Sequence, residues 1–330
     1  MKVLVTGGTG FVGSHVTRTA LKAGHRVRLL ARTPSKVKSI FGPNGSSPAE
    51  VAQGDMLDPA SVASAVAGCD AVVHCAAEIG VPGVGGPRGG TSVNLAGARN
   101  IFEAAREAGC DPVLYVSSVS AFLPTEEPAV SADSPLAEMM SEYGASKRDS
   151  EALAARYRAE GVPVTSLVLG AVYGPDSPGI DGGATSIIGA MDAMMLAPPG
   201  GVGIIDVRDV AELVTRLLVG GQPPRRIMAG GRFVTWPEWT AVLSQACGRE
   251  VPFSEVSADD MRALGRDMDT KRAAGAGVPP LSEEAAVIMA AGRPTDDSEA
   301  LSILGRSWRP AVETFRDTVE FLRRTGRLTS

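Results

Sequence analysis

The sequence predicts an α/β protein built on a doubly wound parallel sheet, with a smaller and mostly helical lobe toward the C-terminus. Two observations lead to this prediction. From the start of the chain as far as Leu169, short apolar segments that fit buried strands alternate with helical patterns. Such alternation is typical of parallel sheets with helices on both faces. After Pro175 the alternation gives way to helical patterns separated by glycine-rich segments, which indicates a second lobe.

The first predicted strand, Lys2 to Thr6, runs directly into a glycine-rich loop, Gly7 to Gly13, that precedes a helical pattern. A strand, a glycine loop and a helix in this order form the Rossmann-type dinucleotide motif. Gly7 would permit the tight turn, Gly10 would let the backbone approach a pyrophosphate, and Gly13 would let the helix pack on the strand. The helix N-terminus would add N–H donors. The alternative is a glycine-rich turn without a ligand. The predicted cofactor contacts here are Gly7, Thr9, Gly10, Phe11, Val12 and Gly13.

The second predicted strand, Arg26 to Ala31, ends at Arg32. An acidic residue about 20 residues past the loop would hydrogen-bond the ribose 2′-hydroxyl of NAD. An arginine suits a 2′-phosphate instead, and Thr33, Ser35 and Lys36 could add donors. The alternative is that Arg32 stacks on adenine or points to solvent. We therefore expect NADP(H) as the favoured cofactor, with NAD(H) as the other option.

A tyrosine and a lysine stand four residues apart at Tyr143 and Lys147 within a helical pattern. Because this spacing places both side chains on one helix face, the ammonium of Lys147 can stabilise the phenolate of Tyr143 and lower its pKa. A tyrosine tuned in this way can exchange a proton near neutral pH. The alternative is a surface tyrosine on an amphipathic helix. Together with a dinucleotide motif, the pair indicates hydride-transfer chemistry.

With both motifs present, the chain resembles the extended short-chain dehydrogenase/reductase family, also called the NAD-dependent epimerase/dehydratase family, over most of its length. Further segments follow in the family's order: Gly54 to Asp58, His74 to Ala77, Val93 to Gly97, Val113 to Ser118, Ala171 to Pro175 and Val207 to Ala211. The resemblance implies that Asp55 accepts from the adenine amino group. It also implies further cofactor contacts from Met56, Cys75, Ala76, Ala77, Asn94 and Lys147.

The resemblance also implies the chemistry. Ser118 would hydrogen-bond a carbonyl oxygen, Tyr143 would deliver the proton, and Lys147 would hold Tyr143 reactive while bonding the nicotinamide ribose. Ser117 is the neighbouring alternative, but strand alternation would turn it away from the face of Ser118. In reverse, the same three residues would oxidise an alcohol. The expected substrate is therefore a small molecule that carries a carbonyl or a secondary alcohol.

Two other activities compete within this family. Dehydratases of nucleotide sugars typically place an acidic pair after the catalytic hydroxyl residue, where this chain has Val119 and Ser120. Epimerases usually end the second strand with an acidic residue, where this chain has Arg32. The family's common Arg-Pro pair is replaced by Leu169-Gly170. A non-catalytic NADP(H)-sensing protein is the alternative outside enzymes, but such members usually lose the tyrosine or the lysine.

The predicted dinucleotide-binding domain comprises residues 1–170 and about 202–230, and the predicted substrate-binding lobe comprises about 171–201 and 231–330. The glycine-rich segments Gly80 to Gly90 and Gly174 to Gly183 are interpreted as loops at the substrate cleft or as plain surface. We expect a strand near Gly203 to Val207. Expected helices are Val210 to Val219, Pro237 to Cys247, Ser282 to Ala291 and Ala311 to Arg324, with Gly248 and Gly326 as helix stops.

Six side chains in or near this lobe suit an apolar or aromatic substrate, because methionine adapts its shape. They are Met139, Met140, Met191, Met194, Met195 and Leu196. Ordinary core packing is the alternative. Together with Asp297 to Ala300 and Leu304-Gly305, the lobe most resembles the dihydroflavonol-reductase and 3-beta-hydroxysteroid-dehydrogenase branch.

Composition excludes several other classes. A formal charge of −5 without a dense Lys/Arg run argues against nucleic-acid or anionic-membrane binding. The four cysteines and three histidines show no metal or redox spacing. The chain begins directly with a strand and has no apolar span of about 20 residues, so we expect a cytoplasmic protein. In many members of the family that this chain resembles, the helices corresponding to Asn94 to Ala108 and Tyr143 to Glu160 pair subunits. A homodimer is therefore one option.

Overall fold

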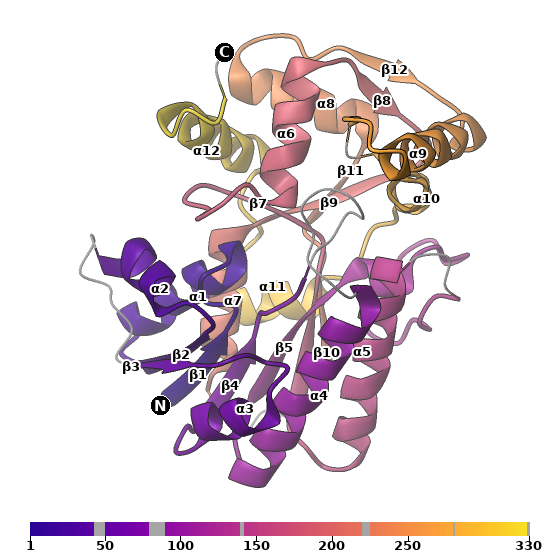
Figure 1. Ribbon diagram of the computed structural model, residues 1–330. Helices are drawn as coiled ribbons and strands as arrows, with labels where there is room; N and C mark the ends of the chain where they lie inside the picture. Colours follow the sequence, from indigo (N-terminus) through magenta and orange to yellow (C-terminus); the bar gives the residue numbers. More distant parts are fainter. Residues whose placement is uncertain (43–49, 79–89, 139–141, 220–224, 280, 329–330) are drawn as a thin grey trace.

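The computed structural model describes residues 1–42, 50–78, 90–138, 142–219, 225–279 and 281–328. Within them, a parallel sheet runs in the order β10-β6-β5-β4-β1-β2-β3 (Figure 1). Its strands are β1 (Lys2–Thr6), β2 (Arg26–Ala31), β3 (Glu50–Gln53), β4 (Ala71–His74), β5 (Val113–Ser118), β6 (Val164–Leu169) and β10 (Arg226–Ala229). The strand order reverses between β1 and β4, which is where open α/β sheets bind their ligands.

Helices cover both faces of this sheet (Figure 1). In β1, Val3 and Val5 belong to one buried apolar cluster while Leu4 belongs to another, because successive side chains of a strand point to opposite faces. The first face carries α1 (Phe11–Lys22), α2 (Pro34–Phe41), α7 (Val207–Leu217) and α11 (Ser298–Leu304). The second carries α3 (Pro59–Val66), α4 (Gly90–Ala108) and α5 (Glu142–Ala159). The predicted doubly wound α/β fold is confirmed.

A second, largely helical part lies beyond the carboxyl ends of the strands (Figure 1). Its helices are α6 (Gly182–Asp192), α8 (Trp236–Cys247), α9 (Ala258–Ala273), α10 (Glu283–Ala291) and α12 (Ala311–Arg324). Two small sheets join them, one formed by β7 (Ala171–Tyr173), β9 (Gly201–Asp206) and β11 (Arg232–Thr235), the other by β8 (Met195–Ala197) and β12 (Phe253–Glu255). A cluster that includes Trp239, Phe315 and Ile187 forms the apolar core of this part.

Short polar side chains set the helix starts. Asp58, Asp181, Asp206 and Ser282 each accept a hydrogen bond from a backbone N–H in the first turn of α3, α6, α7 and α10, which satisfies a donor that the helix itself leaves unpaired. Thr235 and Glu238 form a capping box at α8. Gly248 and Gly326 follow α8 and α12 with positive φ, as predicted for helix stops.

Several predicted bounds need correction. The strand predicted near Gly203 to Val207 is β9, and it pairs with β7 and β11 instead of the main sheet, which β10 completes. Helix α7 begins three residues earlier than predicted, because Asp206 caps it. The predicted loop Gly174 to Gly183 ends at Asp181, the N-cap residue of α6, which begins at Gly182. The predicted loop Gly80 to Gly90 lies outside the described residues except for Gly90, which begins α4.

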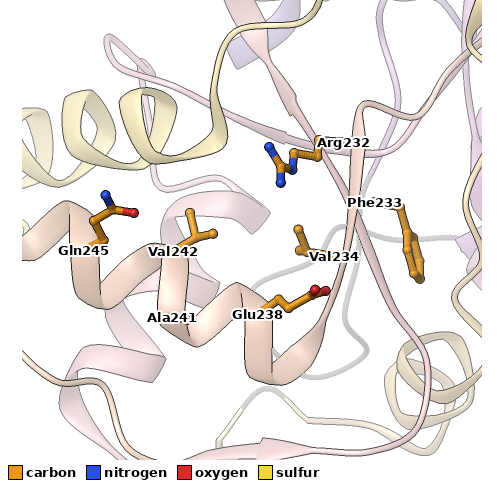
Figure 2. Close-up of a pocket in the computed structure, with 7 residues that line it drawn as sticks. All are labelled: Arg232, Phe233, Val234, Glu238, Ala241, Val242 and Gln245. Atoms are coloured by element: carbon orange, nitrogen blue, oxygen red, sulfur yellow. The ribbon is translucent and has the colours of Figure 1, made fainter.

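The second part of the molecule also carries a small pocket between β11 and α8 (Figure 2). Its lining consists of Arg232, Phe233, Val234, Glu238, Ala241, Val242 and Gln245. None of the predicted site residues belongs to it. In the part of the chain that the structure describes, no helix is long and apolar enough to span a membrane, and no His, Cys, Asp and Glu side chains group as metal ligands.

Candidate active site

The glycine loop between β1 and α1 has no room for side chains at its critical positions. Gly7 has a φ of +70°, and a Cβ there would lie 2.6 Å from the Ala76 nitrogen. A Cβ at Gly13 would lie 2.3 Å from the Gly7 oxygen. The N–H of Gly10 donates to the Gly7 oxygen at 2.8 Å, and Gly10 is the N-cap residue of α1 but offers no capping side chain. This leaves a bare helix N-terminus, which fits a dinucleotide pyrophosphate.

Thr6 joins this loop to the end of β4. Its hydroxyl lies 2.6 Å from Nδ1 of His74 and accepts from the Ala76 N–H at 3.4 Å. The N–H of Cys75 donates to the Thr6 carbonyl at 3.2 Å. These bonds bring the segment Cys75, Ala76 and Ala77 beside Gly7, so the structure assembles the first and fourth strand ends that the sequence assigned to one cofactor.

At the end of β2, Arg32 is exposed, and its Nη1 lies 3.9 Å from Oε1 of Glu78, which follows β4. The Asp55 carboxylate accepts from the Leu57 N–H at 3.0 Å. The Met56 carbonyl accepts from Asn100 of α4 at 2.9 Å. The Asp55 and Met56 turn is thus fixed at the sheet edge next to β2, where the adenine end of a dinucleotide is expected.

Asn94 is nearly buried, and its amide is used by protein groups. Its Oδ1 accepts from the Glu78 N–H at 2.7 Å, and its Nδ2 donates to the Glu78 carbonyl at 3.0 Å and to Ser146 Oγ at 3.1 Å. Asn94 therefore links the segment after β4 to α5. In this structure it acts as a positioning residue for both walls of the candidate site.

Ser118 ends β5 and caps the 3-10 turn η2 (Val119–Phe122). Its Oγ accepts from the Ser120 hydroxyl at 2.9 Å, which leaves its own hydrogen for another acceptor. Ser117 is buried, and its hydroxyl has no hydrogen-bond partner among the described residues. The half-buried Ser118 remains the better candidate for contact with a substrate.

Tyr143 and Lys147 both belong to α5, one turn apart, as the spacing predicts. The side chain of Tyr143 lies outside what the structure describes. The N–H of the next residue, Gly144, donates to Glu284 of α10 at 3.2 Å, so a helix of the second part holds the start of α5. Helix α5 also packs against β5 and the turn that Ser118 caps. The three predicted catalytic positions therefore lie on neighbouring elements.

Lys147 is only 5% exposed. Burial lowers the pKa of its ammonium to about 8, and the negative charge of Glu151 opposes that shift. Lys147 in turn affects a residue at the end of β4. Burial, with a smaller contribution from the Lys147 charge, lowers the pKa of the His74 imidazole to about 3. Burial raises the pKa of the Cys75 thiol to about 12. The Lys147 charge thus acts on a neutral histidine and a neutral thiol at the end of β4.

A fully buried carboxylate, Glu151, follows Lys147 by one turn on α5. Its Oε1 accepts from Arg158 at 3.2 Å and from Arg226 of β10 at 3.1 Å. The Arg226 guanidinium lies over the Phe122 ring, 4.8 Å from its centroid. Two cations thus keep an anion in the interior, where an unpaired charge would be costly.

Where the family commonly has an Arg-Pro pair, this chain has Leu169-Gly170, and packing explains the glycine. A Cβ at Gly170 would lie 2.0 Å from the Gly230 oxygen, so backbone from after β10 occupies the space of any side chain there. The following turn is held by other means. His15 of α1 bonds the Pro175 carbonyl through Nε2 at 3.0 Å, and the Tyr173 hydroxyl accepts from Trp239 at 3.1 Å.

The methionines divide between two environments. Met191 is buried in the core of the second part, Met195 packs against it, and Met194 is 56% exposed. For Met191 the structure favours ordinary core packing. Leu196 is half-buried on β8, and Met139 and Met140 lie outside the described residues.

Sequence reasoning missed Glu78, Glu151, Glu284 and His15. Glu151 had a usable signal, because it lies four residues after Lys147 and an acid at that spacing pairs with a base on a helix. Glu284 and His15 act across about 140 and 160 residues of chain, and no local pattern announces such contacts.

Comparison with known proteins shows which family this arrangement belongs to. The model of the NAD dependent epimerase/dehydratase family matches residues 3–230, so the chain belongs to that family. A pyridine dinucleotide is accordingly its cofactor class, and the glycine loop fits it.

Two curated relatives match this chain over very different lengths. A 3-beta-hydroxysteroid dehydrogenase of Mycolicibacterium neoaurum is 36% identical over 129 residues, which cover 36% of this chain and 32% of that enzyme. The chain thus spans about a third of the length of that relative. Sterol demethylase protein B of Methylococcus capsulatus is 26% identical over 332 residues, covering 99% of both chains.

Solved structures confirm the fold. The structure of gox2253 superposes with a TM-score of 0.81 at 26% identity, covering 99% of both chains. Vestitone reductase from alfalfa gives 0.73 at 20% identity, covering 99% of both chains. A nucleoside-diphosphate-sugar epimerase from Pseudomonas aeruginosa gives 0.80 at 21% identity, covering 100% of this chain and 99% of that chain. Reductase and epimerase thus share this fold, and the fold does not choose between them.

Proposed function

We propose that this protein is an NAD(P)-dependent oxidoreductase that transfers hydride between nicotinamide and a carbonyl or secondary alcohol of a small, apolar or aromatic substrate. The observation that carries the proposal is the buried Lys147 ammonium on α5, whose charge acts on His74 and Cys75 at the end of β4. That strand end packs on the Gly7 loop. A lysine one turn after a tyrosine thus acts on the strand end that packs on the glycine loop, where we expect the nicotinamide.

In this proposal a bound nicotinamide supplies or accepts the hydride. Ser118 donates its free hydroxyl hydrogen to the substrate oxygen, and Tyr143 gives that oxygen a proton during reduction. The positive charge of Lys147 favours the phenolate that forms, because an opposite charge nearby stabilises an ionised group. His74 is neutral, so it adds no competing charge, and its bond to Thr6 holds the strand ends together.

The substrate class rests on three supports. No acidic pair follows Ser118, where Val119 and Ser120 stand. The full-length relative from Methylococcus capsulatus is named for sterol demethylation, and other relatives are named hydroxysteroid dehydrogenases. One further relative is a 2-alkyl-3-oxoalkanoate reductase, 34% identical over 120 residues. A largely hydrocarbon skeleton that carries oxygen is common to the compounds in these names.

Nucleotide-sugar epimerisation is the second candidate, favoured by the name of the family whose model matches residues 3–230. It requires that a ketone formed at the sugar be reduced again by the same cofactor, so no net oxidation occurs. Interconversion of UDP-glucose and UDP-galactose would replace the reductase proposal. Cofactor binding without turnover of any carbonyl would favour a sensor.

The proposal also covers the division into domains and the pairing of subunits. Residues 1–170 and about 202–230 would form the dinucleotide-binding domain, and the remainder would form the substrate-binding lobe. A homodimer would pair through α4 and α5.

The cofactor preference gives a direct prediction. Arg32 favours a 2′-phosphate, so NADPH and NADP should raise the thermal unfolding midpoint more than NADH and NAD at equal concentration, because ligand binding to the folded state stabilises it. The Arg32→Gln variant should lose this preference and respond no more strongly to NADPH and NADP than to NADH and NAD. The matched control is Arg26→Gln, at the other end of β2 and similarly exposed, with side-chain exposures of 70% and 68%. Equal shifts in the unmodified protein would contradict the role of Arg32.

A further inference from the structure

Glu78 follows the end of β4 in a fixed backbone position. Its N–H donates to Asn94 Oδ1 at 2.7 Å, and its carbonyl accepts from Asn94 Nδ2 at 3.0 Å. Asn94 is itself bound to Ser146 of α5. The buried Asn94 side chain thus bonds both backbone polar groups of Glu78. The backbone of Glu78, and with it the direction of its side chain, is therefore fixed by α4 and α5.

The Glu78 carboxylate is partnered on one side only. Its Oε1 lies 3.9 Å from Nη1 of Arg32, while its Oε2 is buried and has no hydrogen-bond partner among the described residues. The side chain is 17% exposed, against 68% for Arg32. A buried carboxylate oxygen without a donor is unfavourable. A ligand that brings hydroxyl donors would therefore be stabilised here.

Arg32 and Glu78 extend from the ends of β2 and β4, the two strands adjacent to β1. Their approach therefore crosses the carboxyl end of β1, from which the glycine loop starts. We expect a dinucleotide laid along that loop to pass close to both side chains. Hydroxyl donors of a ribose suit the free oxygen of Glu78, whereas a phosphate would be repelled by it and attracted by Arg32.

We propose that Glu78 is a cofactor-specificity residue that accepts a hydrogen bond from a ribose hydroxyl and opposes the preference of Arg32 for a 2′-phosphate. This inference rests on the proposed dinucleotide site. The pair then makes the protein accept both NAD(H) and NADP(H), with Arg32 favouring one and Glu78 limiting the difference. We expect a weaker NADP(H) preference from this pair than from an arginine at the end of β2 alone.

The test is a double-mutant cycle on binding, read by titration of the reduced cofactors without substrate. In Glu78→Gln, the affinity for NADPH relative to NADH should rise about tenfold, because the negative charge is removed while the shape is kept. In Arg32→Gln, the relative affinity should fall. In the double variant, the change caused by Glu78→Gln should differ from its effect in the parent, because the two charges are coupled. Glu320→Gln, an exposed acid on α12, is the matched control and should change nothing.

An unchanged NADPH to NADH ratio in Glu78→Gln, with both cofactors still bound, would overturn this inference and leave the dinucleotide site intact. If neither cofactor binds the unmodified protein, the proposed function fails instead. Circular dichroism of each variant checks folding, and the exposed Arg32→Gln variant provides a readout that does not depend on a buried substitution.

Discussion

Turnover of Tyr143→Phe is expected to fall by about a thousandfold, because a positioned general acid contributes roughly 100-fold to 10,000-fold to rate. Affinity for the reduced cofactor should stay within about twofold, since the variant removes only the hydroxyl. Steady-state reduction of a carbonyl substrate, followed by the loss of NADPH absorbance, measures the first quantity. Fluorescence titration of the cofactor measures the second.

The matched control lies on the same helix. Tyr157→Phe removes a hydroxyl that donates to Glu103 at 2.9 Å, toward the other end of α5. It should reduce the free energy of unfolding by about 1 kcal/mol, as expected for one lost hydrogen bond, and leave turnover unchanged. If Tyr143→Phe kept most of its activity, the proton donor would be a different residue.

The second large effect is expected for Gly7→Ala. The methyl group would lie 2.6 Å from the Ala76 nitrogen, and the residue would also have to hold a φ of +70°. The left-handed backbone alone costs roughly 1–2 kcal/mol for a residue with a side chain. We expect cofactor affinity to fall at least about a hundredfold, because β1 and β4 must separate where the dinucleotide binds.

The Gly24→Ala variant introduces the same backbone strain as Gly7→Ala but without the steric clash. Gly24 has a φ of +86°, similar to Gly7, but a Cβ there would meet no atom within 4 Å. This variant should lose about 1 kcal/mol of stability by the same backbone argument and bind cofactor normally. Equal cofactor affinity in the two variants would show that the loop does not approach the dinucleotide closely.

The sequence predicts the first half of the fold well because its signals are local. Strands β1 and β2 and helix α12 have the predicted bounds, and the glycine loop has the predicted geometry. The helices α9 and α11 were not predicted. Helix α9 is mostly polar, with Met261 and Gly265 as its buried residues, so it lacks the apolar stripe on which a prediction depends.

Strand β9 shows a different limit. Its sequence reads as a strand, but its partners are chosen by contacts far along the chain: β7 lies about 30 residues before it and β11 about 30 after it. Pairing of this kind depends on tertiary packing, including the close approach of Gly203 to the Gly230 oxygen. Local patterns show that a strand exists, and they do not show which sheet it joins.

The candidate site shows the same difference between local sequence signals and long-range contacts. The order of Gly7, Asp55, Ser118, Tyr143 and Lys147 along the chain leads to the prediction of which residues act. The groups that position them come from distant segments, as Glu284 does for the start of α5 and Asn94 does for Glu78. Glu78 itself belongs to no motif, and its relevance rests on its approach to Arg32 and on its unpartnered oxygen.

Transfer of deuterium from C4-deuterated NADPH tests the central proposal most directly. The protein is incubated with a panel of aromatic aldehydes, flavonoid ketones and ketosteroids, and the products are analysed by mass spectrometry. The proposal predicts an alcohol with deuterium on its carbinol carbon, formed by the unmodified protein and nearly absent with Tyr143→Phe. Interconversion of UDP-glucose and UDP-galactose, with no deuterium delivered to any carbonyl of the panel, would contradict it.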